Sequence, residues 1–322
     1  MSEPVNTPAR IARRRRVGVF ILLAFVPLAA AELVARWGLG LGDPPLFVKD
    51  DAIEYLLKPG TYHRFGQTIS INRWSQRSPD IEPRRTDPRE VRVLVLGDSV
   101  VYGGAQLDDT QLATTLAEKA LRDALGRPVR VLNIAAGSWG PQNQLAYVRR
   151  FGLFDADVAV IVWSSHDAWD VPRFASLGPD LPERTPTFAL AESISRYLLP
   201  RLRRAEPAAA VAPGDIDEAC ASAAELLAFL NERGIPTRVL LHSTRGELRG
   251  TPDPSQPLQI GRERLQQVIV DAGTSWTGTG EAFSDSLSRG ESPFRDDIHP
   301  SAEGQKLLAD LLEKMVRSAV ER

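Results

Sequence analysis

The sequence predicts an α/β fold, a three-layer sandwich with a mostly parallel sheet that is preceded by an N-terminal transmembrane helix. Short apolar segments alternate with amphipathic ones from residue 90 onward, and this alternation is typical of a parallel sheet with helices on both faces. An uncharged apolar run behind a cluster of arginines predicts the transmembrane helix. We therefore expect one large domain behind a membrane segment.

The N-terminal segment is predicted to anchor the protein in a bacterial inner membrane. Residues 1–16 form a basic cytoplasmic segment that ends in four arginines. Residues 17–36 form the signal-anchor, which up to Ala35 carries Glu32 as its one charge and is just long enough to cross a hydrocarbon core of about 30 Å. Because basic residues stay in the cytoplasm, the rest of the chain is expected in the periplasm or outside the cell.

The same segment allows two other interpretations. Ala29-Ala30-Ala31 resembles a signal-peptidase site behind an apolar core, and cleavage there would release the protein. The arginines also suggest twin-arginine export, although the surrounding pattern is poor. With an anchor or a cleaved signal, the domain that follows lies outside the cytoplasm.

The rest of the chain divides into a connecting segment and the main domain. Residues 37–89, rich in proline, glycine and charge, are interpreted as a stalk or as a cap on the main domain, residues 90–322. Strands are expected at 91–96, 129–134, 158–163 and 237–242, and helices at 110–125, 142–151, 215–233, 258–272 and 301–318. A proline-rich insertion at 170–214, with a short helix near 190–199, is typical of a lid, a substrate wall or surface decoration.

Composition excludes some classes of function. The chain has 322 residues, a net charge of −2 and a single cysteine. This charge argues against nucleic acid as a partner, and a lone cysteine cannot form an internal disulfide. Because no pair of His, Asp or Glu has a recognised metal-ligand spacing, we expect neither a metal nor another cofactor.

Two short segments supply a nucleophile and its base. Ser99, in Gly97-Asp98-Ser99, follows a buried strand and so lies at the carboxyl edge of the predicted sheet, where such sheets bind ligands. A serine needs a base beside it to act as a nucleophile. His299 can take the serine proton, and Asp296, three residues earlier, can curl back to the other imidazole nitrogen and fix its tautomer.

These pieces resemble the SGNH hydrolases, also called the GDSL esterase/lipase family, over about residues 90–322. The matching residues are Gly97-Asp98-Ser99, Gly137 after the second strand, and Asp296-x-x-His299, and their order and spacing also fit. The resemblance implies a flavodoxin-like sheet and ester hydrolysis through an acyl-serine. It also favours Asp296 over Asp297, since the family's acid stands three positions before the histidine.

Three groups are predicted to form the oxyanion hole. Ser99 offers its backbone N–H, and Gly137 can bring a second N–H close because it has no side chain. The family has an asparagine as a third donor, where this chain has His166. A neutral imidazole can donate one N–H, so His166 is interpreted as an oxyanion donor or a substrate contact, with a structural histidine as the alternative.

Two tryptophans and one further histidine fall near the predicted active-site loops. Trp139 and Trp169 are candidate substrate contacts, because aromatic faces suit sugar rings and acyl chains. Core packing is the alternative for both tryptophans. His242 ends a predicted strand, and a structural role is the favoured interpretation.

The sequence thus predicts an extracytoplasmic serine esterase that hydrolyses acyl esters, O-acetyl esters of carbohydrates foremost. Its partners would be an acylated small molecule or glycan and the membrane. One alternative is an O-acyltransferase, in which a sugar hydroxyl replaces water at the same triad. The other is a catalytically inactive glycan-binding module, which the histidine at position 166 would explain through a decayed oxyanion hole.

Overall fold

The computed structural model describes residues 25–202, 214–250 and 256–321, together with Arg16, Val19, Leu23 and Ala212. Most of the predicted cytoplasmic segment and part of the predicted signal-anchor therefore lie outside the described residues. Within the part of the chain that is described, no helix combines the length and the apolar character needed to cross a bilayer.

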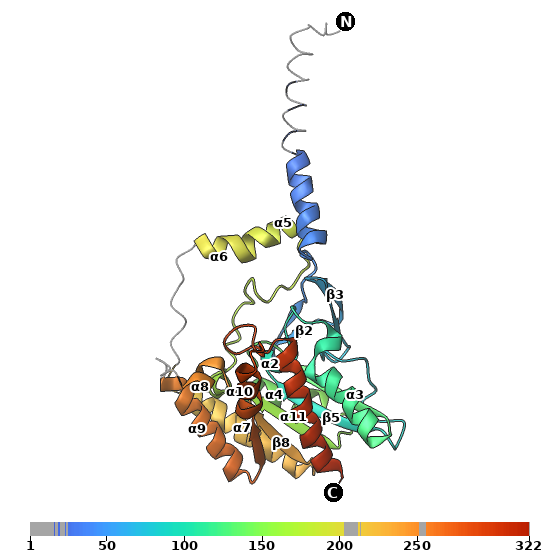
Figure 1. Cartoon of the computed structure of the whole chain (residues 1–322), viewed down its shortest axis with the longest axis vertical. Coiled ribbons are helices and arrows are strands. Elements are labelled where there is room, and N and C mark those ends of the chain that lie inside the picture. Colours follow the sequence, from blue (N-terminus) through green and yellow to red (C-terminus); the bar gives the residue numbers. More distant parts are fainter. Residues whose placement is uncertain are drawn as a thin grey trace, which may run out of the picture.

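A parallel sheet of five strands forms the centre of the described structure (Figure 1). The strands are β5 (Val91–Gly97), β6 (Val129–Ala135), β7 (Val158–Trp163), β8 (Thr237–Leu241) and β9 (Ser275–Gly278). They run across the sheet in the order β6-β5-β7-β8-β9, which is the flavodoxin-like order. The predicted three-layer α/β fold with a parallel sheet is confirmed.

The strand order places a binding crevice beside β5. Val91 pairs with Val129 at the start of β5 and β6, whereas Val93 pairs with Val158 on the other side, in β7. The direction of the chain across the sheet therefore reverses between β5 and β7. In open α/β sheets, ligands bind at the carboxyl ends of the strands at such a reversal.

Helices cover both faces of the sheet. α3 (Ala113–Leu125) and α11 (Ala302–Val320) pack together on one face, and α4 (Pro141–Phe151), α7 (Asp215–Glu232) and α9 (Gln256–Asp271) cover the other. The shorter helices α8 (Arg245–Arg249) and α10 (Gly280–Ser288) follow β8 and β9.

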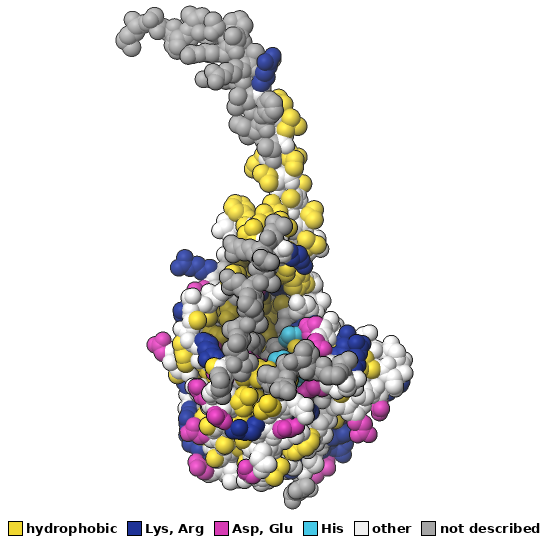
Figure 2. Space-filling view, turned by 90° about the vertical axis from the view of Figure 1, so that its left-hand side faces the viewer, with side chains coloured by type: hydrophobic (Ala, Val, Ile, Leu, Met, Phe, Trp, Pro, Cys, Tyr) yellow, Lys and Arg dark blue, Asp and Glu magenta, His cyan; other side chains and the backbone are white. Residues whose placement is uncertain are grey.

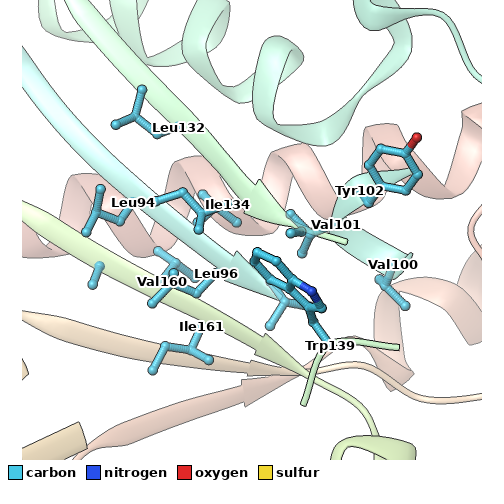
Figure 3. Packing of buried hydrophobic residues seen from close by; sticks show 14 of the residues in the cluster. Leu94, Leu96, Val100, Val101, Tyr102, Leu132, Ile134, Trp139, Val160 and Ile161 are labelled. Atoms are coloured by element: carbon cyan, nitrogen blue, oxygen red, sulfur yellow. The ribbon is translucent and has the colours of Figure 1, made fainter. Parts of the chain in front are cut away.

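The core lies between these layers and reaches the carboxyl edge of the sheet. Leu94, Leu96, Ile134 and Val160 are fully buried side by side on neighbouring strands (Figure 3). Each such side chain contributes about 1.5–3 kcal/mol when it leaves water. Val101, from the short helix α2 (Ser99–Tyr102), extends this core to the end of β5, so the turn after β5 rests on a rigid base.

Residues 47–71 form two β-hairpins, which we call the cap. β1 (Phe47–Asp50) pairs with β2 (Glu54–Leu57), and β3 (Gly60–Arg64) pairs with β4 (Gln67–Ile71), both antiparallel. The second hairpin turns at Phe65 and Gly66, whose φ angles are 53° and 74°. A two-residue type I′ turn requires positive φ at both positions. Buried cap residues such as Ile53, Leu57 and Ile69 join the main core, so the cap is part of the domain.

Two helices meet above the cap. The N-terminal helix comprises residues 25–33 and their continuation η1 (Val34–Gly38). The insertion helix, residues 189–202, comprises α5 (Ala189–Glu192), η4 (Ser193–Leu198) and α6 (Leu199–Leu202). It runs crosswise from the foot of the N-terminal helix (Figure 1).

Candidate active site

Ser99 stands where β5 passes into α2. Asp98 caps this helix, because its Oδ1 accepts the backbone N–H of Val100 at 2.8 Å. Gly97 allows the tight turn, since a Cβ at this position would lie 2.4 Å from Cγ2 of Val101. The sharp turn holds Ser99 at the carboxyl edge of the sheet, beside the reversal of strand order.

His299 reaches Ser99 from the loop of residues 294–300, which we call the His299 loop. Its Nε2 lies 2.9 Å from Ser99 Oγ, and its Nδ1 lies 2.8 Å from Oδ2 of Asp296. The serine, the imidazole and the carboxylate are therefore joined in one chain of hydrogen bonds. The arrangement is a Ser–His–Asp triad.

The carboxylate of the triad is fixed from within its own loop. Oδ1 of Asp296 accepts the backbone N–H groups of Ile298 and His299 at 3.1 and 2.8 Å. Burial opposes ionisation of Asp296, but the hydrogen bonds from His299 and Ile298 outweigh it and lower its pKa. Asp296 is therefore an acceptor that keeps the Nδ1–H tautomer of His299 and leaves Nε2 free to take the serine proton.

Asp297 faces another part of the fold. Its carbonyl accepts the N–H of Arg245 at 2.7 Å, and its Oδ1 accepts the N–H of Gly246 at 3.1 Å. Both contacts tie the His299 loop to the start of α8. The structure thus brings Asp296 to the triad and turns Asp297 away from it.

A buried histidine supports the loop from below. His242, fully buried at the end of β8, has its Nε2 2.8 Å from the carbonyl oxygen of Ile298 and its Nδ1 3.3 Å from Oγ1 of Thr279. Burial lowers the pKa of His242 to about 4, so the ring is neutral at physiological pH. A neutral ring that donates from Nε2 holds the backbone next to His299, a positioning role that agrees with the structural interpretation of this residue.

Gly137 lies in the turn after β6 and lines the same pocket as Ser99 and His299. The carbonyl of Ala136 accepts the N–H of Trp139 at 3.4 Å, which closes the turn. The hydroxyl of Tyr55, in the cap, donates to the carbonyl of Gly137. The cap therefore fixes the peptide that follows the candidate oxyanion donor, a contact for which the sequence carries no recognisable signal.

His166 occupies a short 3₁₀ helix, η3 (Ser165–Ala168), directly after β7. Its ring is partly buried and packs edge-on against Trp169, with the ring centroids 5.8 Å apart. Among the described residues, those that line the pocket at Ser99 include Gly137 and His299 but neither His166 nor Trp169. The structure therefore brings two of the three predicted oxyanion residues to the pocket.

The structure places Trp139 in the core, which is the alternative to the interpretation of this residue as a substrate contact. Its side chain is only 1% exposed, and its indole N–H donates to the carbonyl of Tyr55 at 3.2 Å. Figure 3 shows it among the buried residues at the ends of the central strands. Because the ring packs inside the domain beneath the cap, it is a core residue and does not contact substrate.

Three acids lie behind the site. Burial raises the pKa of Asp98 to about 6 and that of Asp170 to about 7, and it raises the pKa of Asp167 well above the ordinary range. The charge of Asp98 raises the pKa values of Asp167 and Asp170 further.

No group of three His, Cys, Asp or Glu in the described ranges is arranged to hold a metal ion.

A pocket of about 240 Å³ opens above the triad. The cap and the insertion build its walls. A substrate wall is one of the roles that the sequence analysis expects of the insertion, and a cap on the main domain is one that it expects of residues 37–89. Its lining comprises Pro45, Phe47, Arg64, Phe65, Ser99, Tyr102, Gly104, Ala105, Gln106, Gly137, Asp180, Leu181, Arg196, Tyr197, Arg295 and His299. A larger hollow of about 690 Å³ lies at the amino ends of β8 and β9, away from the triad.

Each arginine of the pocket has an acidic neighbour. The three pairs, with their N–O distances, are Arg64 with Glu192 at 2.6 Å, Arg196 with Asp180 at 3.4 Å, and Arg295 with Asp296 at 3.9 Å. The charges around the pocket are therefore balanced, which suits a neutral ester better than a charged one.

A further arginine shapes the rim of the pocket from inside. Arg77, which follows the cap, donates to the carbonyls of Tyr102, Gly104 and Leu107 at 2.9, 2.6 and 2.6 Å and pairs with Asp109. Its buried guanidinium thus replaces the missing backbone partners of the segment after α2. This segment supplies one edge of the pocket.

Comparison with solved structures found several esterases of similar fold. The chain is similar to the acetyl xylan esterase AlAXEase, with 14% identity over 71% of this chain and 100% of that chain and a TM-score of 0.48. It is also similar to a lipase/acylhydrolase from Enterococcus faecalis (16% identity, 71% and 96% covered, TM-score 0.45) and to the acetylxylan esterase Axe2 from Geobacillus stearothermophilus (15%, 70% and 94%, TM-score 0.42). No protein-family model and no curated protein matches the chain.

Proposed function

We propose that the protein is a serine esterase that hydrolyses small neutral acyl esters through an acyl-serine intermediate. The observation that carries this proposal is the unbroken contact from Ser99 Oγ through His299 to Asp296. An assembled triad at the mouth of a pocket is what nucleophilic acyl transfer requires. The same intact geometry argues against a catalytically inactive glycan-binding module.

The reaction follows from the triad. Ser99 Oγ attacks the ester carbonyl carbon while its proton passes to Nε2 of His299, and Asp296 stabilises the imidazolium. The backbone N–H groups of Ser99 and Gly137 stabilise the oxyanion. The C–O bond to the leaving alcohol then breaks, and the alkoxide takes the proton from His299. Water attacks the acyl-serine with His299 as base, which releases the acid and restores Ser99.

The pocket supports a short acyl group. Its volume of about 240 Å³ lies below the roughly 300–1,000 Å³ of pockets that enclose a drug-sized ligand. Aromatic residues from the cap, Phe47 and Phe65, line one wall, and such faces suit a sugar ring. An O-acetyl ester of a carbohydrate fits these properties, and we propose it as the substrate class.

We further propose that the N-terminal segment anchors the enzyme in the membrane, with the active site outside the cytoplasm. The arginine cluster before residue 17 and the apolar sequence up to Ala35 support this arrangement. In the described part of the helix, side chains such as Phe25 and Leu28 are more than half exposed, as expected of a segment that contacts lipid.

Hydrolysis of p-nitrophenyl acetate by the full-length protein tests the enzymatic proposal. We expect Ser99→Ala and His299→Ala each to lower kcat by about 10³-fold or more, since residues of a triad act as a unit. Ser284→Ala is the matched control, because Ser284 is an exposed serine in α10. An unmodified protein no faster than Ser99→Ala would overturn the proposal.

Two further substrates refine the result. p-Nitrophenyl octanoate should be cleaved more slowly than the acetate, because its longer acyl chain and the nitrophenyl ring compete for the same small pocket. Addition of an oligosaccharide acceptor separates hydrolysis from transfer. Release of acetate at an unchanged rate supports the esterase, whereas acetylated oligosaccharide in place of free acetate would identify an O-acyltransferase.

A further inference from the structure

The insertion helix turns its apolar side away from the protein. Ile194, Leu198 and Leu199 are 41%, 50% and 38% exposed, and Phe188, directly before the helix, is 59% exposed. A helix on the surface of a water-soluble domain has the opposite pattern, with its apolar side inward. We propose that the insertion helix lies flat on a lipid surface, with these side chains in the boundary between head groups and acyl chains.

The polar side of this helix is engaged with the domain. Glu192 is buried and pairs with Arg64 of the cap at 2.6 Å. The hydroxyl of Tyr197 accepts from Nη2 of the same arginine at 2.8 Å. These contacts with Arg64 fix the orientation of the helix. With the polar side bound to the domain, the apolar side faces outward.

The outer apolar surface continues onto the N-terminal helix. In the described part of the chain, nine of the eighteen exposed large apolar side chains lie between Val19 and Leu39, and four more lie between Phe188 and Leu199. Figure 2 shows hydrophobic side chains along the N-terminal helix and around its foot. A membrane that receives the N-terminal helix therefore meets the insertion helix next, which favours lipid over a second protein as the occupant.

Direct contacts hold the two helices at this junction. The carboxylate of Glu32 accepts the backbone N–H groups of Ala189 and Leu190 at 3.0 and 2.8 Å, and thus caps the insertion helix from the N-terminal helix. Ala35 and Ala189 are buried together in a small apolar cluster beside them. The crosswise arrangement in Figure 1 is the one required when one helix enters a bilayer and the other lies on it.

Trp37 marks the level of the surface. It is 77% exposed at the lower end of the N-terminal helix, near the junction with the insertion helix. Tryptophan is enriched where a bilayer meets water, because its ring is apolar and its N–H is polar. Its position agrees with a membrane surface at the height of the insertion helix.

This docking would place the active site close to the membrane. Arg196 and Tyr197 belong to the insertion helix and also line the pocket at Ser99. A helix is about 10 Å across, so the pocket would lie about one helix diameter below the lipid head groups. Esters held at the membrane surface would be the accessible substrates. The inference rests on the anchored orientation proposed above.

The test uses full-length protein in vesicles of phosphatidylethanolamine and phosphatidylglycerol. The variants Ile194→Cys, Leu198→Cys and the control Asn231→Cys are made in a Cys220→Ala background, which removes the buried native thiol. Each carries an environment-sensitive fluorophore on its one thiol. Asn231 is exposed near the start of β8, at the far end of the sheet. We expect the probes at 194 and 198 to emit at shorter wavelength and to be quenched by lipids with a nitroxide in the acyl chain, and the control to do neither.

Each other outcome contradicts the inference. Probes at 194 and 198 that behave like the control on vesicle-bound protein would show that the helix stays in water. A shifted emission without quenching by the lipid nitroxide would show that protein, a second copy or another partner, covers the helix. Protein that does not float with the vesicles would contradict the anchor as well. Hydrolysis of p-nitrophenyl acetate by the same vesicles shows separately whether the enzymatic proposal holds.

Discussion

Two adjacent aspartates of the His299 loop differ in their partners, which makes them a matched pair. Asp296 accepts from Nδ1 of His299, whereas Asp297 accepts from the backbone of Gly246. We expect Asp296→Asn to lower kcat/KM for p-nitrophenyl acetate by roughly 10²-fold or more, because an amide N–H facing the imidazole favours the wrong tautomer.

Asp297→Asn is the control for this change. An asparagine oxygen still accepts from Gly246, so kcat/KM should remain near that of the unmodified protein. Equal losses in the two variants would show that the loop as a whole, and not the orienting carboxylate, is sensitive to charge. Because its hydrogen bonds lower the pKa of Asp296, this carboxylate keeps its charge at a lower pH than an ordinary aspartate does.

His166 is the residue at which the sequence departs from the resembled family. Loss of an oxyanion donor typically costs about 10²–10³ in rate. Since His166 packs against Trp169 and is not among the described residues that line the pocket, we expect His166→Ala to lower kcat by less than about tenfold. A loss within the range of a missing donor would instead restore His166 as the third group of the oxyanion hole.

At the scale of elements, the cap connects directly to the chemistry. Removal of the Tyr55 hydroxyl in Tyr55→Phe frees the carbonyl of Gly137 and costs about 1 kcal/mol of folding stability. We expect kcat to fall by about tenfold with little change in KM, because the turn that holds the Gly137 N–H loses its support.

Tyr62→Phe provides the comparison for this change. Its hydroxyl donates to the carbonyl of Lys58 at 2.8 Å, within the cap and away from Gly137. The two variants should lose similar stability in urea titrations, and only Tyr55→Phe should lose kcat. If both variants retain full kcat, the cap does not position the oxyanion donor.

Elements with a strong periodic pattern could be predicted from the sequence, and weakly patterned ones could not. The apolar runs of β5 and β7 identify both strands to within a residue or so of their observed ends. β9 (Ser275–Gly278) was missed because it is a short strand at the edge of the sheet, with largely exposed and polar residues. The cap hairpins were missed for a related reason, since their short strands are stabilised by packing on the domain and not by local pattern.

The residues of the candidate site also fall into those that the sequence predicts and those that it does not. Ser99, Asp296 and His299 were predictable because their chemistry depends on residue type and spacing along the chain. The roles of Tyr55, Arg77 and His242 depend on contacts between distant segments, which no local pattern encodes.

For the whole molecule, Asp170 links stability to pH. Burial raises its pKa in the folded protein to about 7 from the usual value of 3.8. The folded state therefore binds more protons than the unfolded state between these values, and this carboxyl costs stability as the pH rises through that window. Asp170→Asn removes this cost. The free energy of unfolding of the variant, relative to that of the unmodified protein, should therefore rise by on the order of 2–4 kcal/mol between about pH 4 and about pH 8.

Thermal unfolding at the two pH values measures the effect. Asp123→Asn is the control, since Asp123 is exposed on α3. This variant should change the melting temperature by the same amount at both pH values. A melting-temperature difference between Asp170→Asn and the unmodified protein that is independent of pH would show that Asp170 is already ionised in the folded state at low pH. The lowered pKa of His242 acts in the opposite direction and is common to both proteins, so it cancels in the comparison.

The 200 residues that separate Ser99 from His299 mean that the two partners of the triad are synthesised at different times. A ribosome that has completed α2 has already produced the serine, whereas His299 is added only when nearly the whole chain has been translated. Gln305 then ties the last helix to the beginning of the domain, through bonds to the carbonyl of Val100 and the N–H of Ala113. An unfinished or truncated chain therefore carries Ser99 without the histidine that would take its proton.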